Sequence, residues 1–387
     1  MAPGFRDMDF QFTDEQLQLR RSVREFALAE IAPHVREWDD HETFPADAVR
    51  ALGQLGYLGC VFPEAYGGAD LDYLSYCLVV EELSRVDPSV ALIVAAHTSL
   101  CANHLALFGS DDQKQRYLPK LASGEWLGCW ALTEPSSGSD AGGARSVATR
   151  TGDGWTLNGS KTFCTNAHHA QLAIVLCVTN RAAQPHGMSA FLVETDTPGF
   201  RLGRKEQKLG MRASATGEIV LEDCHVADAQ RLGREGEAFI DTLRLLDGGR
   251  ISIAALSVGL AQGAYDAAVA YAKTRRQFGR SIAEFQAIQH KLADMATEID
   301  AARLLTYRAA TAYMNGEPVT KLSSMAKLFA SEAATRAAGE AVQIHGGYGF
   351  IKDYGVEKFY RDVKLCTIGE GTSEIQRMVI ARELLKE

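Results

Sequence analysis

The chain has 387 residues, of which 46% are hydrophobic and 23% are charged, values that are ordinary for a soluble globular protein of two or three domains. Its net charge of −9 argues against nucleic acid as a main partner. The eight cysteines are scattered without a C-x-x-C pair, which predicts reduced, mostly buried thiols in a reducing compartment.

The first part of the chain, residues 10–125, is predicted to be helical. Apolar residues recur there at helical spacing, and four prolines separate the expected helices. The first stripe is Leu17, Val23, Phe26 and Ala27, the second is Leu78, Val79, Glu82 and Leu83, and the prolines are Pro33, Pro45, Pro63 and Pro88.

Residues 126–230 change to short, β-rich apolar runs bounded by turn residues. The expected strands are Trp155–Gly159, which we interpret as running into a turn, and 172–178, 190–194 and 218–222. From about residue 236 the helical period returns, with a stripe at Ile288, Leu292, Met295, Ile299 and Ala302. Long helices with few breakers predict a bundle. No G-x-G-x-x-G follows a strand, so a Rossmann dinucleotide site is not indicated.

Near the end of the chain, one carboxylate lies between two glycines, in Gly369-Glu370-Gly371. Flanking glycines let the backbone approach a ligand, so Glu370 could remove a proton next to a carbonyl while its own N–H faces the carbonyl oxygen. The same segment also fits an ordinary helix start, with Thr372 or Ser373 as the cap and Glu374 in the first turn.

Two long segments resemble the signature sequences of the acyl-CoA dehydrogenase family. The first is Ala131-Leu-Thr-Glu-Pro-Ser-Ser-Gly138-Ser139-Asp140-Ala-Gly142, and the second is Gln343-Ile-His-Gly346-Gly347-Tyr-Gly349-Phe350-Ile-Lys-Asp353 with Lys358 and Asp362. Arg275-Arg-Gln-Phe278-Gly279 and the Glu370 segment also stand where the family has landmarks. The resemblance extends from about residue 10 to residue 385. The chain resembles the short-chain and short/branched-chain enzymes most strongly, notably at residues 246–251 and 291–295.

The resemblance implies an α+β multidomain fold. Its parts would be an N-terminal α-helical domain (1–125), a middle β-barrel-like domain (126–235) and a C-terminal four-helix bundle (236–387), assembled as a homotetramer. It also implies a flavoenzyme that binds FAD and oxidises an acyl-CoA to the trans-2-enoyl-CoA. Glu370 would take the α-proton, hydride would pass to flavin N5, and an electron-transferring flavoprotein would accept the electrons.

The resemblance also implies a set of FAD ligands in the middle domain. Leu132 and Thr133 would contact the pyrimidine edge of the flavin and stabilise its reduced form. Phe163, where relatives commonly have Trp, would still cover a ring face. Thr165 would bond near N5, and Ser139 would reach both a flavin phosphate and the substrate.

A second set of FAD ligands is expected from the C-terminal domain. In the family Arg275, Phe278 and Gln286 hold the FAD of a neighbouring subunit, and a guanidinium suits a pyrophosphate. A lone Arg at a helix end is also an ordinary partner of the helix dipole. The remaining expected FAD contacts are Gln343, Gly346, Gly347, Thr372 and Glu374.

For the substrate, the resemblance implies contacts from Ser139, Asp247, Arg250 and Gly371. One branch of the family carries its base at the position of Gly249, and here that position is glycine, which leaves Glu370 as the base. The basic stretch formed by Arg204, Lys205, Lys208 and Arg212 either lies near CoA phosphates or forms a solvated loop face. The pairs His97/His104 and His34/His41 have no carboxylate or cysteine at metal-ligand spacing, so no metal is expected.

The apolar segment Val90–Ala96, which borders the pocket floor in the family, contains no Arg or Lys. A dicarboxylic acyl group would leave a carboxylate unpaired there, so we do not expect a glutaryl-type activity. The resemblance to the short-chain and short/branched-chain enzymes implies a short or short-branched acyl group instead. Gly369 stands where short- and medium-chain relatives often have Tyr, which predicts room for a 2-methyl-branched or small cyclic acyl group.

Two alternatives to a dehydrogenase stay open. One is an acyl-CoA oxidase-like flavoenzyme, although such enzymes are usually longer, and the other is a non-catalytic CoA- or FAD-binding protein on the same fold. Met1 to Phe10 has neither a signal pattern nor a transit peptide, and we expect no apolar run to be long enough to cross a bilayer. We therefore expect a cytoplasmic protein without a membrane partner, or a mitochondrial-matrix protein in a eukaryote.

Overall fold

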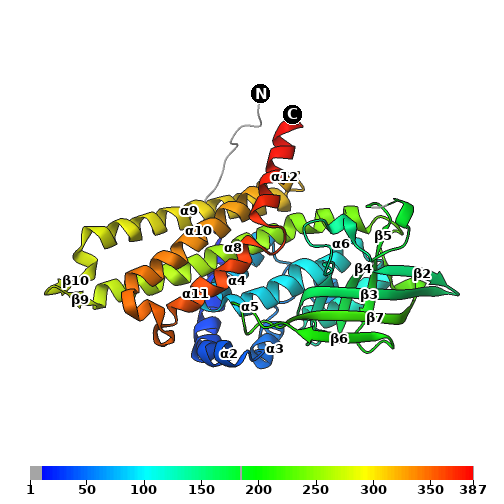
Figure 1. Ribbon diagram of the computed structural model, residues 1–387, viewed down its shortest axis with the longest axis horizontal. Helices are drawn as coiled ribbons and strands as arrows, with labels where there is room; N and C mark the ends of the chain where they lie inside the picture. The colour runs from blue at the N-terminus through cyan, green and yellow to red at the C-terminus, as the bar shows by residue number, and fades with distance from the viewer. Residues whose placement is uncertain (1–10, 184, 387) are drawn as a thin grey trace.

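The computed structural model describes residues 11–183 and 185–386, so the expectations for Met1 to Phe10 lie outside the described residues. Helices form the first part of the chain, strands the middle and helices again the last part (Figure 1). This order confirms the predicted fold class. The divisions after residues 125 and 235 remain our proposed domain boundaries.

Short helices build the first part, and the predicted prolines lie at or near helix starts. Pro45 is the cap of α3, and Pro88 is the first residue of α5. The helices are α1 (Asp14–Phe26), α2 (Val35–His41), α3 (Ala46–Gln54), α4 (Tyr73–Val86), α5 (Pro88–Ala95), α6 (Asn103–Phe108) and α7 (Asp111–Ala122), with a π-helical segment η4 (Ala96–Ala102) between α5 and α6.

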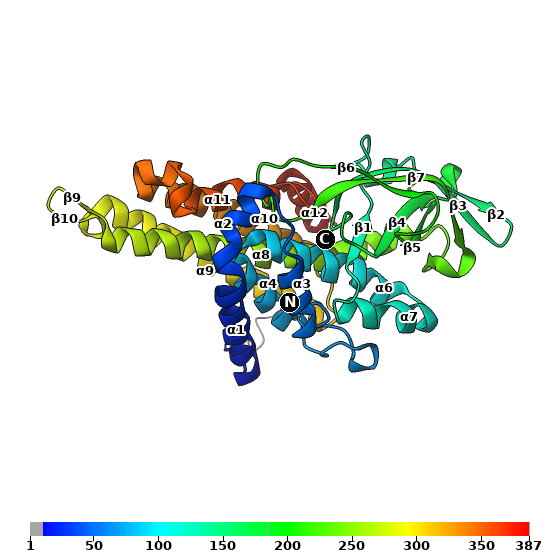
Figure 2. The same cartoon turned by 90° about the horizontal axis from the view of Figure 1, so that it is seen from below.

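The middle part is a sheet in the order β6-β7-β3-β2-β4-β5-β8, with β1 parallel to β4. Its strands are β1 (Gly128–Ala131), β2 (Val147–Thr151), β3 (Gly154–Thr165), β4 (Leu172–Val178), β5 (Met188–Glu194), β6 (Phe200–Lys205), β7 (Thr216–Ala227) and β8 (Arg231–Leu232). Strand β4 is buried along its whole length, because α6 and α7 pack on one face of the sheet and a second apolar cluster fills the other (Figure 2). This two-sided burial explains its unbroken apolar sequence.

The turn expected at Gly159 is wrong, since β3 continues through it as a twelve-residue strand. Gly159 instead marks a bulge, where the pairing of β3 with β7 shifts register between Leu157 and Gly159. Its φ of +143° and the overlap that a Cβ would make with Ser146 explain why glycine stands there.

The last part is a bundle of long helices. It contains α8 (Ala238–Thr274), α9 (Gln286–Met314), α10 (Thr320–His345), α11 (Val356–Asp362) and α12 (Ser373–Leu385), with a small hairpin of β9 (Arg276–Gln277) and β10 (Arg280–Ser281) at its far end. Helix α4 packs so closely on α8 that a Cβ at Gly259 or Gly263 of α8 would overlap the carbonyls of Glu81 and Arg85. The first helical part and the bundle thus share one apolar core.

Two helical stretches, Pro88–Phe108 and Ala238–Thr274, are long and apolar enough by composition to cross a membrane, which corrects our judgement that no apolar run reaches that length. An 18-residue apolar window of the first stretch is 89% buried within the fold, and one of the second stretch is 67% buried. Core helices of soluble proteins have the same character, so length and composition alone are weak evidence for a membrane span.

Candidate active site

The segment around Glu370 connects a 3₁₀ segment, η11 (Val363–Thr367), to α12. Thr372 caps α12, and its side chain accepts a hydrogen bond from the N–H of Ile375 at 3.3 Å, so the helix-start interpretation is correct as a description of the backbone. Glu370 itself has φ 54° and Gly371 has φ 94°. A glutamate in the left-handed region is uncommon and costs about 1–3 kcal/mol, which the surrounding structure must offset.

Side chains from two helices hold this turn. Gln376 of α12 donates through Nε2 to the carbonyls of Glu370 at 3.1 Å and Gly371 at 3.0 Å. Lys327 of α10, which is 0% exposed, donates through Nζ to the same Gly371 carbonyl at 2.7 Å. The backbone carbonyls of the turn are therefore held by one donor from α10 and one from α12.

The carboxyl group of Glu370 lies directly against Gly249 of α8. A Cβ at position 249 would overlap Glu370 Oε2 and come within 3.2 Å of Leu100 in η4. The two positions at which the family carries its base therefore point into the same space, and a side chain at 249 would displace the Glu370 carboxyl group. This is the strongest geometric link between the two sequence features.

Glu370 Oε2 is buried and has no hydrogen-bond partner within the part of the chain that the structure describes. Burial raises the pKa of Glu370 to about 7, and the nearby Lys327 and Arg250 oppose that rise. An unsolvated carboxylate with a pKa near neutrality has the properties of a general base.

Asp247 and Arg250 lie on the same helix as Gly249. Arg250 Nη1 donates to Asp247 Oδ1 at 2.9 Å, and Thr320 Oγ1 donates to Asp247 Oδ2 at 2.7 Å. Burial lowers the pKa of Arg250. The buried pair places one guanidinium close to Glu370 with its charge partly offset by Asp247.

The segment that carries Leu132 and Thr133 follows β1 and is tied to β3. The N–H of Thr162 donates to the carbonyl of Thr133 at 2.8 Å. Lys161, fully buried, donates through Nζ to the carbonyl of Leu132 at 3.1 Å and to Glu134 at 2.7 Å. Glu134 in turn accepts from two backbone N–H groups, those of residues 145 and 146 at 2.6 and 2.9 Å. This buried ion pair fixes both ends of the loop that contains Ser139.

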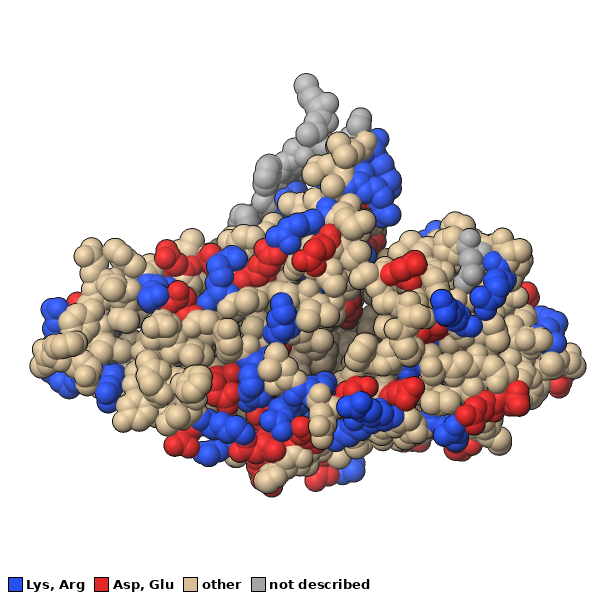
Figure 3. Space-filling view, viewed as in Figure 1, with Lys and Arg blue, Asp and Glu red and all other residues tan. Residues whose placement is uncertain are grey.

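Phe163 is the middle-domain residue whose geometry best fits a planar ligand. It lies in an irregular stretch of β3 between Lys161 and Cys164, with φ 57°, and is 65% exposed. A strained backbone that presents an aromatic face to open space is a ready stacking surface. Thr165 ends the same strand, and Ser139 is exposed on the loop beyond β1. The face drawn in Figure 3 is hollowed between the bundle and the sheet, beneath α12.

The other expected FAD ligands gather at the far end of the bundle. Arg275 follows α8 and lies over the ring of Tyr348 at 5.1 Å, and with Gly346 and Gly347 it lines a cavity of about 450 Å³. Phe278 is 94% exposed at φ 51° in the hairpin. Gln286, at the start of α9, and Gln343, near the end of α10, are both exposed.

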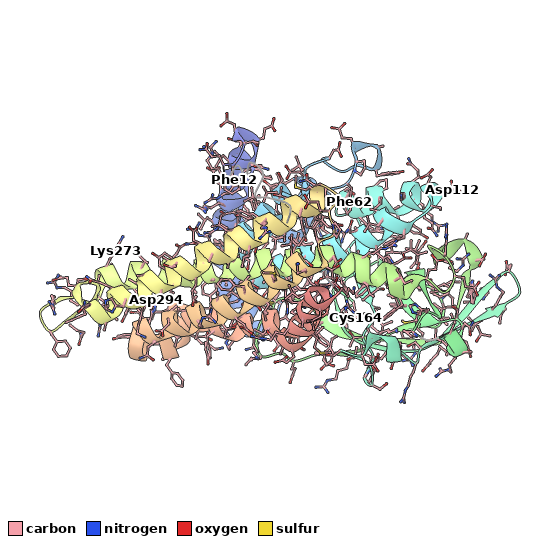
Figure 4. All side chains as sticks on the ribbon, turned by 90° about the horizontal axis from the view of Figure 1, so that it is seen from above. Phe12, Phe62, Asp112, Cys164, Lys273 and Asp294 are labelled. Atoms are coloured by element: carbon pink, nitrogen blue, oxygen red, sulfur yellow. The ribbon has the colours of Figure 1, made fainter. Side chains whose placement is uncertain are left out.

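The chain does not bring these two sets of residues together. Arg250 and Arg275 are separated by one uninterrupted helix, whose length over those 25 residues is about 38 Å. Figure 4 shows the same separation, with Lys273 at one end of the bundle and Cys164 of the sheet far from it. Glu370, Thr372 and Glu374 belong to the set near the sheet. The resemblance had implied that Arg275, Phe278 and Gln286 serve another subunit's FAD, but it had not implied this for Gln343, Gly346 and Gly347, which the structure places at the same end of the bundle.

The roles of four side chains at the site were missed from the sequence: those of Lys327, Gln376, Lys161 and Glu134. A signal for Lys327 did exist, because it falls in an Ala- and Ser-rich stretch at the buried helical spacing of Ser323, Ala330 and Ala334. A lysine in that register is buried, and a buried lysine needs a partner.

Several other polar residues singled out from the sequence have structural partners. His97 accepts from the N–H of Gly128 and contacts the carbonyl of Leu121, and His104 accepts from the indole of Trp130. In the basic stretch, Lys205 and Arg212 bond to Glu42, and Lys208 bonds to the carbonyl of Ser214. All eight cysteines are free and buried, as predicted.

Known proteins match this chain over nearly its whole length. Residues 13–125, 129–224 and 239–385 match the family models of the acyl-CoA dehydrogenase N-terminal, middle and C-terminal domains. A probable acyl-CoA dehydrogenase of Bacillus subtilis is 51% identical over 98% of this chain and 100% of its own length. The short-chain specific acyl-CoA dehydrogenase of Clostridium acetobutylicum is 45% identical over 98% of this chain and 100% of its own length.

Two solved structures have nearly the same fold. The butyryl-CoA dehydrogenase of Megasphaera elsdenii has a TM-score of 0.96 at 43% identity, and the match covers 98% of this chain and 100% of that one. A chain from a study of the electron transferring flavoprotein of Acidaminococcus fermentans has a TM-score of 0.97 at 45% identity, with 98% and 100% coverage.

Proposed function

The chain belongs to the acyl-CoA dehydrogenase family, whose members are FAD enzymes, and from that premise we propose that it converts a short-chain acyl-CoA to the trans-2-enoyl-CoA with Glu370 as the base. The observation that carries the proposal is the buried, unpartnered Oε2 of Glu370 facing Gly249. A carboxylate in that position is poised to take a proton from a carbon that enters the same space.

In the proposed reaction, the chain's own residues bind the thioester and move one proton. Glu370 removes the α-proton, and the two electrons of that C–H bond form the new α,β double bond as the β-hydrogen leaves. Bound FAD supplies the hydride acceptor. The N–H of Glu370 is the proposed donor to the thioester oxygen, where negative charge develops as the proton leaves.

The residues present fit FAD. Phe163 offers an exposed aromatic ring, Leu132 and Thr133 offer backbone and hydroxyl groups on a loop fixed by Lys161, and Ser139 is exposed on the same loop. We propose Leu132, Thr133, Ser139, Phe163, Thr165, Thr372 and Glu374 as contacts of one FAD, and Ser139, Asp247, Arg250 and Gly371 as contacts of the substrate.

We further propose that the set at the far end of the bundle serves the FAD of a neighbouring subunit. The length of α8 supports this, because Arg275 and Glu370 of one chain are too far apart to meet the same flavin ring. A homotetramer in which Arg275, Phe278, Gln286, Gln343, Gly346 and Gly347 reach across a subunit boundary would place both sets around each cofactor.

The test of the base is Glu370→Gln in the FAD-loaded protein. We expect the variant to stay yellow and folded and to bind butyryl-CoA, but to lose turnover by about a hundred- to ten-thousandfold. Glu15→Gln, an exposed residue of α1, is the matched control and should keep full activity. Turnover of Glu370→Gln within tenfold of the parent would show that the base is elsewhere.

The proposed substrate is a short straight or short-branched acyl-CoA. The relatives named short-chain specific and butyryl-CoA dehydrogenase support the chain length. The buried, uncharged segment Val90–Ala96 supports the exclusion of a dicarboxylic acyl group. For kcat/KM, we expect butyryl- and 2-methylbutyryl-CoA to exceed octanoyl- and palmitoyl-CoA. A long-chain optimum would contradict the assignment.

Gly369 is the proposed source of tolerance for branching. The nearest atoms to a Cβ there belong to Leu365, at 3.4 Å or more, and the position is not in the left-handed region, so the backbone accepts a side chain. Gly369→Tyr should therefore fold and should lower the ratio of branched to straight turnover. An unchanged ratio would mean that the space beside Gly369 does not reach the acyl chain.

The proposed electron acceptor is an electron-transferring flavoprotein, because one structural neighbour comes from a study of the electron transferring flavoprotein of Acidaminococcus fermentans. Another neighbour, a prolyl acyl carrier protein oxidase, has a TM-score of 0.94 at 34% identity. Because that relative is named an oxidase, the experiment must also test whether oxygen is reduced directly. Anaerobic bleaching of the flavin by butyryl-CoA, with slow peroxide formation in air, is expected. Peroxide at the rate of substrate loss would favour an oxidase.

A further inference from the structure

We propose that Lys327 is a positioning residue for the reaction, a buried cation that holds the Glu370–Gly371 turn in place and favours the ionised form of the Glu370 carboxyl group. The inference rests on the proposed role of Glu370 and goes beyond it, because it assigns the control of the base to a side chain 43 positions earlier in the sequence.

The first observation is the burial of Lys327 in the middle of α10. Its side chain is 0% exposed, and its helix neighbours Ser323, Ser324, Ala326 and Ala330 are buried as well. Placing an amine there is unfavourable unless the amine makes specific hydrogen bonds. Nζ donates to the carbonyl of Gly371 at 2.7 Å, a charge-assisted bond to the residue directly after Glu370.

The second observation is the strain in the turn. Glu370 and Gly371 have consecutive positive φ angles of 54° and 94°. The Gly371 carbonyl accepts from both Lys327 and Gln376, which uses both of its lone pairs. The turn therefore keeps its unusual conformation through one charged donor from α10 and one neutral donor from α12.

The third observation is the charge around the carboxyl group. The ionisable groups near Glu370 and Lys327 are Arg250 on α8, Tyr73 on α4, Cys366 in η11 and Glu374 on α12. Arg250 is bonded to Asp247, so its field is partly offset. Lys327 donates instead to a neutral carbonyl, which leaves its charge free to act on Glu370.

The direction of the effect follows from the pKa values. Burial raises the pKa of Glu370 to about 7, and Lys327 acts against that rise. Burial lowers the pKa of Lys327 to about 8. Removing the cation should therefore raise the pKa of Glu370 further, so the acid side of the pH profile should move to higher pH. A purely structural lysine would not move it.

The test compares four variants of the FAD-loaded enzyme. Lys327→Met removes the charge and the donor, Lys327→Arg keeps the charge, and Gln376→Leu removes only the neutral donor. Lys364→Met, at an exposed position in η11, is the matched control. The readouts are kcat and KM for butyryl-CoA, the pH profile of kcat/KM, and hydrogen exchange of the peptide spanning residues 366–376.

We expect Lys327→Met to lower kcat at least tenfold, to speed hydrogen exchange in this peptide, and to move the acid side of the profile up by about one unit. Gln376→Leu should speed exchange and lower kcat without moving the profile, and Lys327→Arg should also leave the profile in place. Lys364→Met should change nothing. If Lys327→Met does not fold, Lys327→Gln replaces it with the same expectation.

An unmoved profile in Lys327→Met, or an equal displacement in Lys327→Met and Lys327→Arg, would overturn the inference. These outcomes are separable from failure of the proposed function. Turnover in Glu370→Gln would refute the base itself, whereas an inactive Glu370→Gln with a normal Lys327→Met would refute only the role of Lys327.

Discussion

Replacing Gly249 by alanine should separate activity from stability. The added Cβ would overlap Glu370 Oε2 and come within 3.2 Å of both Glu370 Cδ and Leu100 Cδ2. The end of the glutamate side chain is the softest of these neighbours, so it should move, by about 1 Å, and a misplacement of that size costs on the order of a hundredfold in rate. We therefore expect kcat to fall about a hundredfold while FAD content stays normal.

Stability should change in the opposite direction. Gly249 lies in the interior of α8, where alanine is favoured over glycine by about 0.5–1 kcal/mol. Displacing a flexible carboxylate costs the fold little, so the urea midpoint of Gly249→Ala should equal or exceed that of the parent. The coupled result, lower activity in a protein at least as stable, distinguishes a blocked base from a damaged helix.

The matched control is Gly339→Ala in α10, where a Cβ would meet only Tyr360 Cε2, at 3.8 Å. This variant should gain the same helix stability and keep full activity. Both proteins are assayed with butyryl-CoA and a dye acceptor, with unfolding followed by circular dichroism. If Gly249→Ala keeps kcat within threefold of the parent, the space above Gly249 is not where Glu370 acts.

Three other predictions follow from the same geometry. The pKa of Glu370, raised to about 7 by burial, implies that kcat/KM rises with pH up to about 7 as the base loses its proton; a flat profile down to pH 5 would contradict it. Arg275→Ala should lose a charge-assisted bond of about 1.5–3 kcal/mol to FAD, so flavin content and tetramer should fall together in gel filtration; a variant that stays yellow and tetrameric would exclude the contact across subunits. Lys358→Met should leave the buried carboxylates of Asp87 and Asp362, now bonded at 2.7 and 2.6 Å, without their cation; we expect a loss of about 3–5 kcal/mol in urea unfolding, and a loss below 1 kcal/mol would refute it.

The parts of the site that were predictable are those whose signal is local in the sequence. Glycines beside Glu370 and a threonine two residues later indicated both a close approach and a helix cap, and the structure contains the cap and the buried carboxyl group. The apolar run 172–178 gave strand β4 because β-rich residues continue without interruption through a strand buried on both faces.

The parts that were missed depend on contacts between distant segments. The Gly159 bulge exists because β3 must shift its pairing with β7, and that information is in the partner strand. Gln376 could not be distinguished from an exposed helix residue, since its two acceptors are backbone carbonyls that point to it only after the turn has formed. Lys161 and Glu134 are 27 residues apart and meet through the fold of the sheet.

The geometry explains why long helices surround such a short segment. A left-handed glutamate and an unsolvated carboxyl group are both unfavourable, so the turn would relax without rigid neighbours. Helix α10 brings Lys327, α12 brings Gln376, and α8 brings the bare backbone of Gly249. Each of these contacts fixes the position of Glu370, but a different residue at the same place would make the fold more stable. Such a conflict between stability and activity is usual at a functional site. Stabilising substitutions should therefore be tolerated on these helices everywhere except where they face Glu370.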